Sequence, residues 1–257
     1  MSYRIKVGSK SPPTDETQLL NRMERFAFLV QEHRQGVWVG TAVLLVAVAA
    51  VAAVMWVDHR NAEQALKLNG QAMRVYLDRP ADQRVKADEK LKQAISLFRQ
   101  LVEQYPRVPS APLTLYHLGN ALVQANDLGG AIEAYKKFIA SYGANRTLLG
   151  LVYQRLGYAY LLNGDQDQAV KAFSAVLDMV GASNKDHALF ELGKLEETQS
   201  RPEGALARYQ ELTKGYPASP LANEAAVRIK ALQVKRDHES GATEGREGTA
   251  TVGEPGK

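Results

Sequence analysis

The longest apolar run in the chain lies near its N-terminal end. Residues 36–57 read GVWVGTAVLLVAVAAVAAVMWV, without a charged side chain. A bilayer core about 30 Å thick requires roughly 20 apolar residues in a helix, so this run is long enough to span it. Trp38 and Trp56 stand 18 residues apart. At about 1.5 Å per residue, that spacing places one indole near each membrane interface. The pattern predicts a transmembrane helix over 36–57.

Two other interpretations of this run are a buried helix of a soluble domain and a cleaved signal peptide. A soluble helix of this length normally shows a polar face, and this run has none. Residues 50–52, Ala-Val-Ala, resemble a cleavage site. However, the apolar core of a signal peptide is usually about 7–15 residues long. The sequence therefore favours an uncleaved anchor in the lipid bilayer.

Charge leaves the orientation of this anchor almost undecided. Each side carries three nearby basic residues: Arg22, Arg25 and Arg34 before the run, and Arg60, Lys67 and Arg74 after it. Additional basic residues at positions 4, 6 and 10 slightly favour a cytoplasmic N-terminus.

The segments at the two ends of the chain differ from the rest. Within 1–35, apolar residues from position 19 onward recur every three or four positions, which predicts an amphipathic helix. It would lie along the membrane surface, or be a solvated helix that leads into the anchor. Residues 236–257 contain almost no large apolar side chain, so we predict a disordered tail there.

Between the anchor and the tail, a pattern of small and aromatic residues recurs every 36–38 positions. An alanine, an apolar residue and, four positions after the alanine, an aromatic ring begin at Ala94, Ala131, Ala169 and Ala205. A Leu-Gly pair precedes the last three alanines, with glycines at 119, 157 and 193. Glycine within a helix costs about 1 kcal/mol relative to alanine. We therefore expect Gly119, Gly157 and Gly193 to mark close packing against a second helix, with the alanines as its small partners.

This pattern resembles the tetratricopeptide repeat, a helix pair normally of 34 residues. Leu-Gly, the small alanine, the aromatic and a closing proline such as Pro106 or Pro217 carry the resemblance, which covers 112–143, 150–181 and 186–217. The unit that ends at Pro106 matches only in its second helix, because the loop at Pro80 displaces the first.

The resulting fold class is all-α. A single transmembrane helix is followed by a tetratricopeptide-repeat solenoid over 58–235, which a C-terminal helix over 221–234 caps. On that cap, we expect four basic side chains to face water: Arg228, Lys230, Lys235 and Arg236.

The whole-chain arrangement is similar to the bacterial YfgM-type family, the ancillary subunit of the SecYEG translocon. Residues 28–35, Phe-Leu-Val-Gln-Glu-His-Arg-Gln, resemble the segment before that family's membrane span. The resemblance implies an inner-membrane protein with a cytoplasmic N-terminus and periplasmic repeats. It would be an interaction scaffold for components of the translocon or of a chaperone network.

An alternative is an envelope organiser in cell division or outer-membrane assembly. The Tyr-Pro phrases at 105–106 and 216–217 are similar to repeats of the Tol–Pal-associated division coordinator and of the outer-membrane assembly lipoprotein. Such a lipoprotein requires a lipid-bearing cysteine, and this chain has none.

Composition argues against several other classes. The 32 basic and 28 acidic residues give a net charge of only +4, so charge does not suggest nucleic-acid binding. The lack of cysteine excludes disulfides, thiol catalysis and a cysteine-based zinc site. The five histidines show no metal-ligand spacing, and no phosphate-binding glycine motif occurs. We therefore expect no enzyme, no cofactor and no metal.

The function class that remains is the binding of another polypeptide on the protein surface. In a solenoid of helix pairs, the first helix of each pair lines the concave side. The groove positions implied by the repeat are Tyr116, His117, Asn120, Gln154, Arg155, Tyr158, Phe190, Glu191 and Lys194. Aromatic and arginine side chains are frequent binding hot spots. The alternative for each position is an ordinary solvated helix face.

Overall fold

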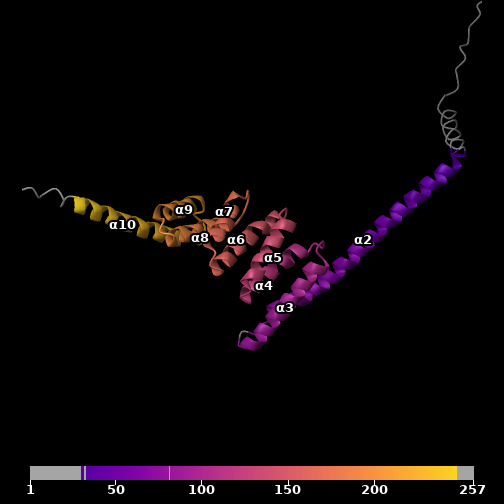
Figure 1. The fold of residues 1–257 in the computed structure, drawn as a ribbon, viewed down its shortest axis with the longest axis horizontal. Coiled ribbons are helices and arrows are strands. Elements are labelled where there is room, and N and C mark those ends of the chain that lie inside the picture. The colour runs from indigo at the N-terminus through magenta and orange to yellow at the C-terminus, as the bar shows by residue number, and fades with distance from the viewer. Residues whose placement is uncertain (1–29, 32, 81, 248–257) are drawn as a thin grey trace, which may run out of the picture. The chain divides into compact units, whose positions relative to one another are not determined.

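The computed structural model describes residues 30–31, 33–80 and 82–247, with side chains described as far as residue 238. Within these residues every regular element is a helix, and nine are numbered α2 to α10 (Figure 1). The N-terminal segment predicted over 1–35 lies almost entirely outside the described residues. The chain divides into two compact units, 1–60 and 61–257.

The first unit contains the apolar part of α2, a helix that extends from Arg34 to Leu77. Its most apolar window is long enough to cross a membrane, and none of that window is buried within the chain. Both predicted interfacial residues, Trp38 and Trp56, are exposed, and the Arg60 guanidinium lies 5.2 Å from the centre of the Trp56 ring.

The second unit begins with the remainder of α2, which is the first helix of the unit that ends at Pro106 and is not displaced by the Pro80 loop as expected. Residues 61–77 of α2 pair with α3 (Arg84–Gln104), so the unit that ends at Pro106 has both of its helices. Ala65 and Ala72 are fully buried, and the Tyr76 ring lies 5.7 Å from that of Phe98. The long loop at Pro80 joins this pair instead of breaking it.

Three further helix pairs follow the first. They are α4 (Ala111–Gln124) with α5 (Leu128–Tyr142), α6 (Arg146–Leu162) with α7 (Gln166–Asp178), and α8 (Lys185–Thr198) with α9 (Pro202–Gly215). Each helix packs on the next in chain order (Figure 1). The Asp127 and Asp165 side chains cap α5 and α7 by accepting backbone N–H bonds at 2.9 and 3.2 Å.

The recurring glycines lie directly beneath the recurring aromatic rings. A Cβ added at Gly157 would lie 2.7 Å from the Phe173 ring, and one at Gly193 would lie 2.5 Å from the Tyr209 ring. Gly119 stands in the same relation to Tyr135. The close approach expected at these glycines is therefore made by the aromatic ring of the second helix. The alanines Ala131, Ala169 and Ala205 are fully buried nearby.

The last helix, α10 (Ala222–Glu247), covers the final pair. Ala225 is buried, and Ile229 and Leu232 pack on a cluster that contains Leu189, Phe190 and Tyr209. The helix continues beyond Lys235 to Glu247, so the tail predicted as disordered from residue 236 is helical as far as Glu247. Once a helix has formed, each added residue gains a backbone hydrogen bond at little extra cost. Residues 248–257 lie outside the described residues.

Arg228 corrects a second expectation for α10, since it does not simply face water. Its side chain is 33% exposed and bonds to Glu197 on α8 at 3.1 Å. It also pairs with Glu224 on its own helix at 3.0 Å. The guanidinium lies over the rings of Phe190 and Tyr209, at 5.5 and 6.0 Å from their centres. These contacts attach the last helix to the array.

Candidate functional site

The predicted groove positions lie on α4, α6 and α8, the first helices of consecutive pairs. Helices α4 and α6 contact each other directly. Hydrogen bonds from Thr114 to Asn69 at 3.1 Å, and from Gln124 to Tyr76 at 2.7 Å, join α4 to α2. The first helices therefore form one continuous surface, which we call the inner face.

His117 lies within a group of rings on the inner face. Its imidazole is 6.1 Å from Phe98, 6.3 Å from Tyr76 and 5.6 Å from Tyr116, measured between ring centres. Burial lowers the pKa of His117 from its usual value, because the protonated ring loses hydration. His117 is therefore neutral at pH 7 and serves as a packing group.

Asn120 accepts a hydrogen bond from the Tyr135 hydroxyl through its Oδ1 atom at 2.8 Å. Tyr135 comes from α5 and is the ring that covers Gly119. Burial raises the pKa of this hydroxyl, so it keeps its proton and donates. The hydrogen bond between Tyr135 and Asn120 therefore connects the ring that packs on Gly119 to a residue of the inner face.

Arg155 on α6 reaches back to the preceding pair. Its Nε atom donates to the Tyr116 hydroxyl at 3.5 Å, and this contact raises the pKa of the guanidinium further above its usual value. The guanidinium is therefore charged at every relevant pH.

The neighbouring Gln154 is held by Asn184, a residue that the sequence analysis did not single out. The Asn184 side-chain amide is buried, and it donates to the Gln154 Oε1 atom at 2.8 Å and to the Gly150 carbonyl at 3.0 Å. A Cβ added at Gly150 would lie 2.8 Å from Asn184 Oδ1. Gly150 makes room for the Asn184 amide. A glycine at this position is the only feature of the sequence that could have indicated the interaction.

Tyr158, Glu191 and Lys194 form a hydrogen-bonded group across α6 and α8. Tyr158 donates to one Glu191 oxygen at 3.2 Å, and the Lys194 ammonium bonds to the other at 3.0 Å. Burial raises the pKa of Tyr158, and the Glu191 charge raises it further. Glu191 is only 8% exposed, and its ion pair with Lys194 compensates the buried charge.

Phe190 lies in the core instead of lining the groove. It is 5% exposed and packs against Tyr209 at 5.7 Å, with the Lys194 ammonium 5.8 Å from its ring centre. Phe190 therefore belongs to the core beneath α10 and presents little surface to a partner.

A pocket of about 270 Å³ opens on the inner face where α2, α4 and α6 meet. Its lining includes three predicted positions, Asn120, Arg155 and Tyr158. It also contains four residues that the sequence analysis did not place there: Tyr76, Val123, Gln124 and Tyr135. Tyr76 could not be placed because its helix reads as a continuation of the anchor.

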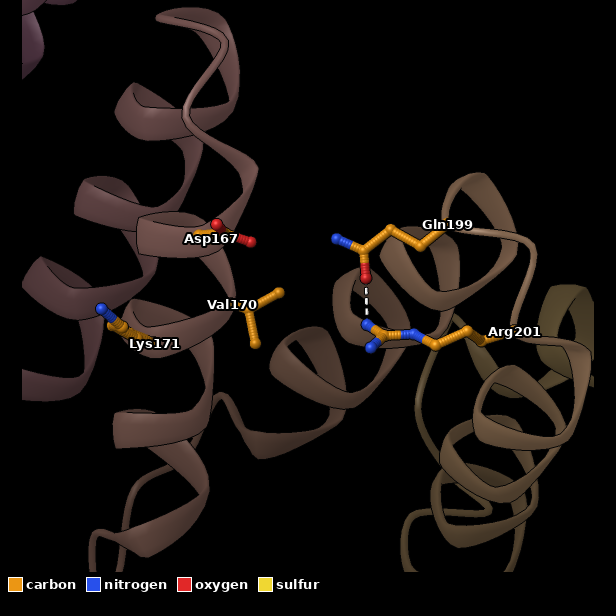
Figure 2. Close-up of a pocket in the computed structure, with 5 residues that line it drawn as sticks. All are labelled: Asp167, Val170, Lys171, Gln199 and Arg201. Atoms are coloured by element: carbon orange, nitrogen blue, oxygen red, sulfur yellow. Dashed lines mark hydrogen bonds between the residues drawn. The ribbon is translucent and has the colours of Figure 1, made fainter.

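A second cavity of about 520 Å³ lies between α7 and the turn from α8 to α9 (Figure 2). Figure 2 shows Val170 and Asp167 of α7 facing Gln199 and Arg201 across it. The Arg201 Nε atom pairs with Glu196 at 2.6 Å, and another nitrogen donates to Gln199. The cation is therefore already neutralised by its own helix pair.

Comparison with protein families gives a match to the tetratricopeptide repeat over residues 86–145 and 155–223. A search among curated proteins finds no match.

Solved structures that match this chain include a tetratricopeptide repeat protein from Parabacteroides merdae ATCC 43184. It shares 17% identity with a TM-score of 0.49, over 69% of this chain and 62% of that one. MamA shares 18% identity with a TM-score of 0.44, over 63% of this chain and 97% of that one. PilW, described as a widely conserved type IV pilus biogenesis factor, shares 13% identity with a TM-score of 0.47, over 63% of this chain and 67% of that one. This chain thus spans less than two thirds of the Parabacteroides protein.

Proposed function

Because this chain belongs to the tetratricopeptide-repeat family, we propose that it is a single-pass inner-membrane scaffold whose periplasmic repeats recruit another polypeptide. The proposed setting is the Sec translocon or a periplasmic chaperone network. Arrays of these repeats are protein–protein interaction modules, and their extended inner surfaces bind partners. We also propose that the chain has no catalytic activity of its own.

The observation that carries the proposal is the order of the two parts along the chain. The apolar stretch in α2 (Arg34–Leu77) is followed directly by residues 61–77 of the array, where Ala65, Ala72 and Tyr76 are buried. A partner bound on the inner face would therefore be captured by a domain that begins where the apolar stretch ends. Recruitment to a membrane-embedded machine requires such an attachment.

The resemblance of residues 28–35 and of the whole-chain order to the YfgM-type family supports the Sec setting over other envelope settings. The same resemblance supports a cytoplasmic N-terminus. A reporter enzyme that is active only in the periplasm, fused after Lys257, tests this orientation directly. Activity of the fusion is the expected result, whereas an inactive fusion of normal abundance would reverse the topology.

Affinity purification tests the partner. The tagged full-length chain, expressed at its natural level and extracted in mild detergent, should co-purify translocon or chaperone components. Tyr116→Ala, on the inner face, should reduce their recovery, while Lys171→Ala, on the outer helix α7, should not. If neither class is recovered with the wild-type chain, the proposal fails. Recovery of cell-division or outer-membrane assembly proteins would instead support the envelope organiser.

A further inference from the structure

The pocket where α2, α4 and α6 meet contains a cation without an acidic partner. Among the described residues, no carboxylate forms an ion pair with Arg155, although Arg201, Arg208 and Arg228 each pair with a glutamate. Within the described part of the chain, the Arg155 guanidinium makes one hydrogen bond, from Nε to the Tyr116 hydroxyl. Its two terminal nitrogens, which carry four N–H donors, therefore remain available.

The side chains around this cation also have donors to spare. The Asn120 Oδ1 atom already accepts from Tyr135, which leaves the Asn120 amide nitrogen as the free end of that side chain. The Tyr76 oxygen accepts from Gln124, so its own hydrogen remains for donation. None of the described residues that line the pocket is acidic. A ligand that matches this set must be an acceptor with negative charge.

Glu191, an acid of the following pair that contacts the pocket residue Tyr158, does not compete for Arg155. Its two oxygens are already engaged by Tyr158 and Lys194. Glu191 is therefore already paired, and among the residues that the structure describes Arg155 keeps its positive charge in this pocket without a carboxylate partner.

We propose that this pocket binds the side-chain carboxylate of an aspartate or glutamate within the partner polypeptide, with Arg155 as its ion partner and Asn120 as a second donor. This inference rests on the proposed function, in which a polypeptide occupies the inner face. A guanidinium and a carboxylate match in geometry and can form two parallel hydrogen bonds. An internal residue fits better than a chain end, because the inner face continues past Arg155 to Glu191 and Lys194 on α8.

The test uses the full-length chain in lipid nanodiscs and a library of random dodecapeptides displayed on phage. Selection is performed on the wild-type chain, on Arg155→Gln and on Arg208→Gln. Arg208 is the matched control, because it is an arginine on the outer helix α9, with its Nη1 atom 3.7 Å from Glu211. Thermal unfolding confirms that each variant is folded before selection.

We expect peptides selected by the wild-type chain and by Arg208→Gln to share an internal aspartate or glutamate. Replacing that acid by its amide in the synthetic peptide should weaken binding at least tenfold, and Arg155→Gln should weaken binding of the acidic peptide to a similar extent. The two changes together should cost little more than either alone, because they remove the same interaction. A merely structural role for Arg155 would give additive losses.

Several outcomes would overturn the inference: selected peptides without an acid, an acid requirement that persists in Arg155→Gln, or no selected peptide. If binding requires only the free C-terminal carboxylate of the peptide, and amidation of that group abolishes it, the ligand of the pocket is a chain end and not a side chain. The result that contradicts the proposed function is different from the result that contradicts the carboxylate site. If Arg155→Gln captures the cellular partner as well as wild type does, the carboxylate site is wrong and the scaffold stands. If the wild-type chain captures no partner, the scaffold is wrong.

Discussion

Gly157 and Phe173 are in such close contact that the helix pair α6–α7 has no room for a single additional carbon atom. A Cβ on residue 157 would lie 2.7 Å from two atoms of the Phe173 ring. Phe173 is fully buried, so its ring cannot move into solvent. The same relation recurs at Gly119 and Gly193. In each of these units, the glycine therefore leaves the space that the aromatic ring occupies.

Gly157→Ala should destabilise the repeat domain even though alanine favours a helix by about 1 kcal/mol. Overpacking a filled core typically costs about 1–3 kcal/mol, which outweighs this gain. Gly70→Ala is the control, because Gly70 is inside α2 and nothing lies within 4 Å of an added Cβ. Thermal unfolding in detergent, followed by circular dichroism, should show a lower midpoint for Gly157→Ala and an equal or higher one for Gly70→Ala. An unchanged midpoint for Gly157→Ala would contradict the interpretation that Gly157 leaves space for the Phe173 ring.

Arg228→Ala should loosen α10 from the array. The substitution removes ion pairs with Glu197 and Glu224 and the contacts over Phe190 and Tyr209. A partly exposed ion pair and a cation–π contact together contribute about 1–2 kcal/mol. Limited proteolysis should cut the variant faster within α10. Lys230→Ala, two residues along the same helix, should leave the cleavage rate unchanged, and equal rates for the two variants would show that Arg228 does not hold the helix.

Asn184→Ala should destabilise the junction between α6 and α8. Asn184 is buried, and its amide donates to Gly150 and Gln154. Truncation leaves the Gly150 carbonyl without this donor and opens a cavity, for a cost of about 1–3 kcal/mol. Asn163→Ala, at the exposed end of α6, should cost less than about 0.5 kcal/mol. Chemical denaturation measures both, and a similar small loss for the two variants would rule out the structural role of Asn184.

His117 should make the stability of the repeat domain depend on pH. Because burial lowers the pKa of His117 in the folded chain, the unfolded chain binds this proton first as the pH falls. The stabilisation is therefore complete above the unfolded value near 6.5 and is lost as the pH falls below it. His117→Gln should show a shallower fall in unfolding midpoint between pH 7.5 and 5 than the wild-type chain. Parallel curves for the two proteins would contradict this assignment.

The helical array could be predicted from the sequence because its signals are local and repeated. Ala131, Ala169 and Ala205, each with an aromatic residue four positions later, identify one face of a helix in every unit. Small and aromatic residues at fixed helical spacing allow few packings, so their burial followed from the pattern. The recurring glycines could also be recognised from the sequence. The pattern did not show that the ring of the second helix covers them.

The contents of the pocket could not be predicted in the same way. Tyr76 is 48 residues from Gln124, whose amide bonds to its hydroxyl, and a long loop at Pro80 hides the pairing of its helix with α3. Arg228 looked like a solvated cation because its glutamate partner, Glu197, is 31 residues earlier. Neither relation has a periodic signal, since each occurs once.

The amino-acid sequence by itself determined that the chain has one apolar helix and a series of helix pairs with a closing helix, because each follows from spacing along a single helix. Only the tertiary structure decided which polar groups satisfy one another and which remain available. Glu191 is neutralised by Tyr158 and Lys194 across two helices, whereas Arg155 is left with its terminal nitrogens unpaired among the described residues. Hydrogen bonds and ion pairs act over a few ångströms in space, so a distance along the chain cannot reveal them.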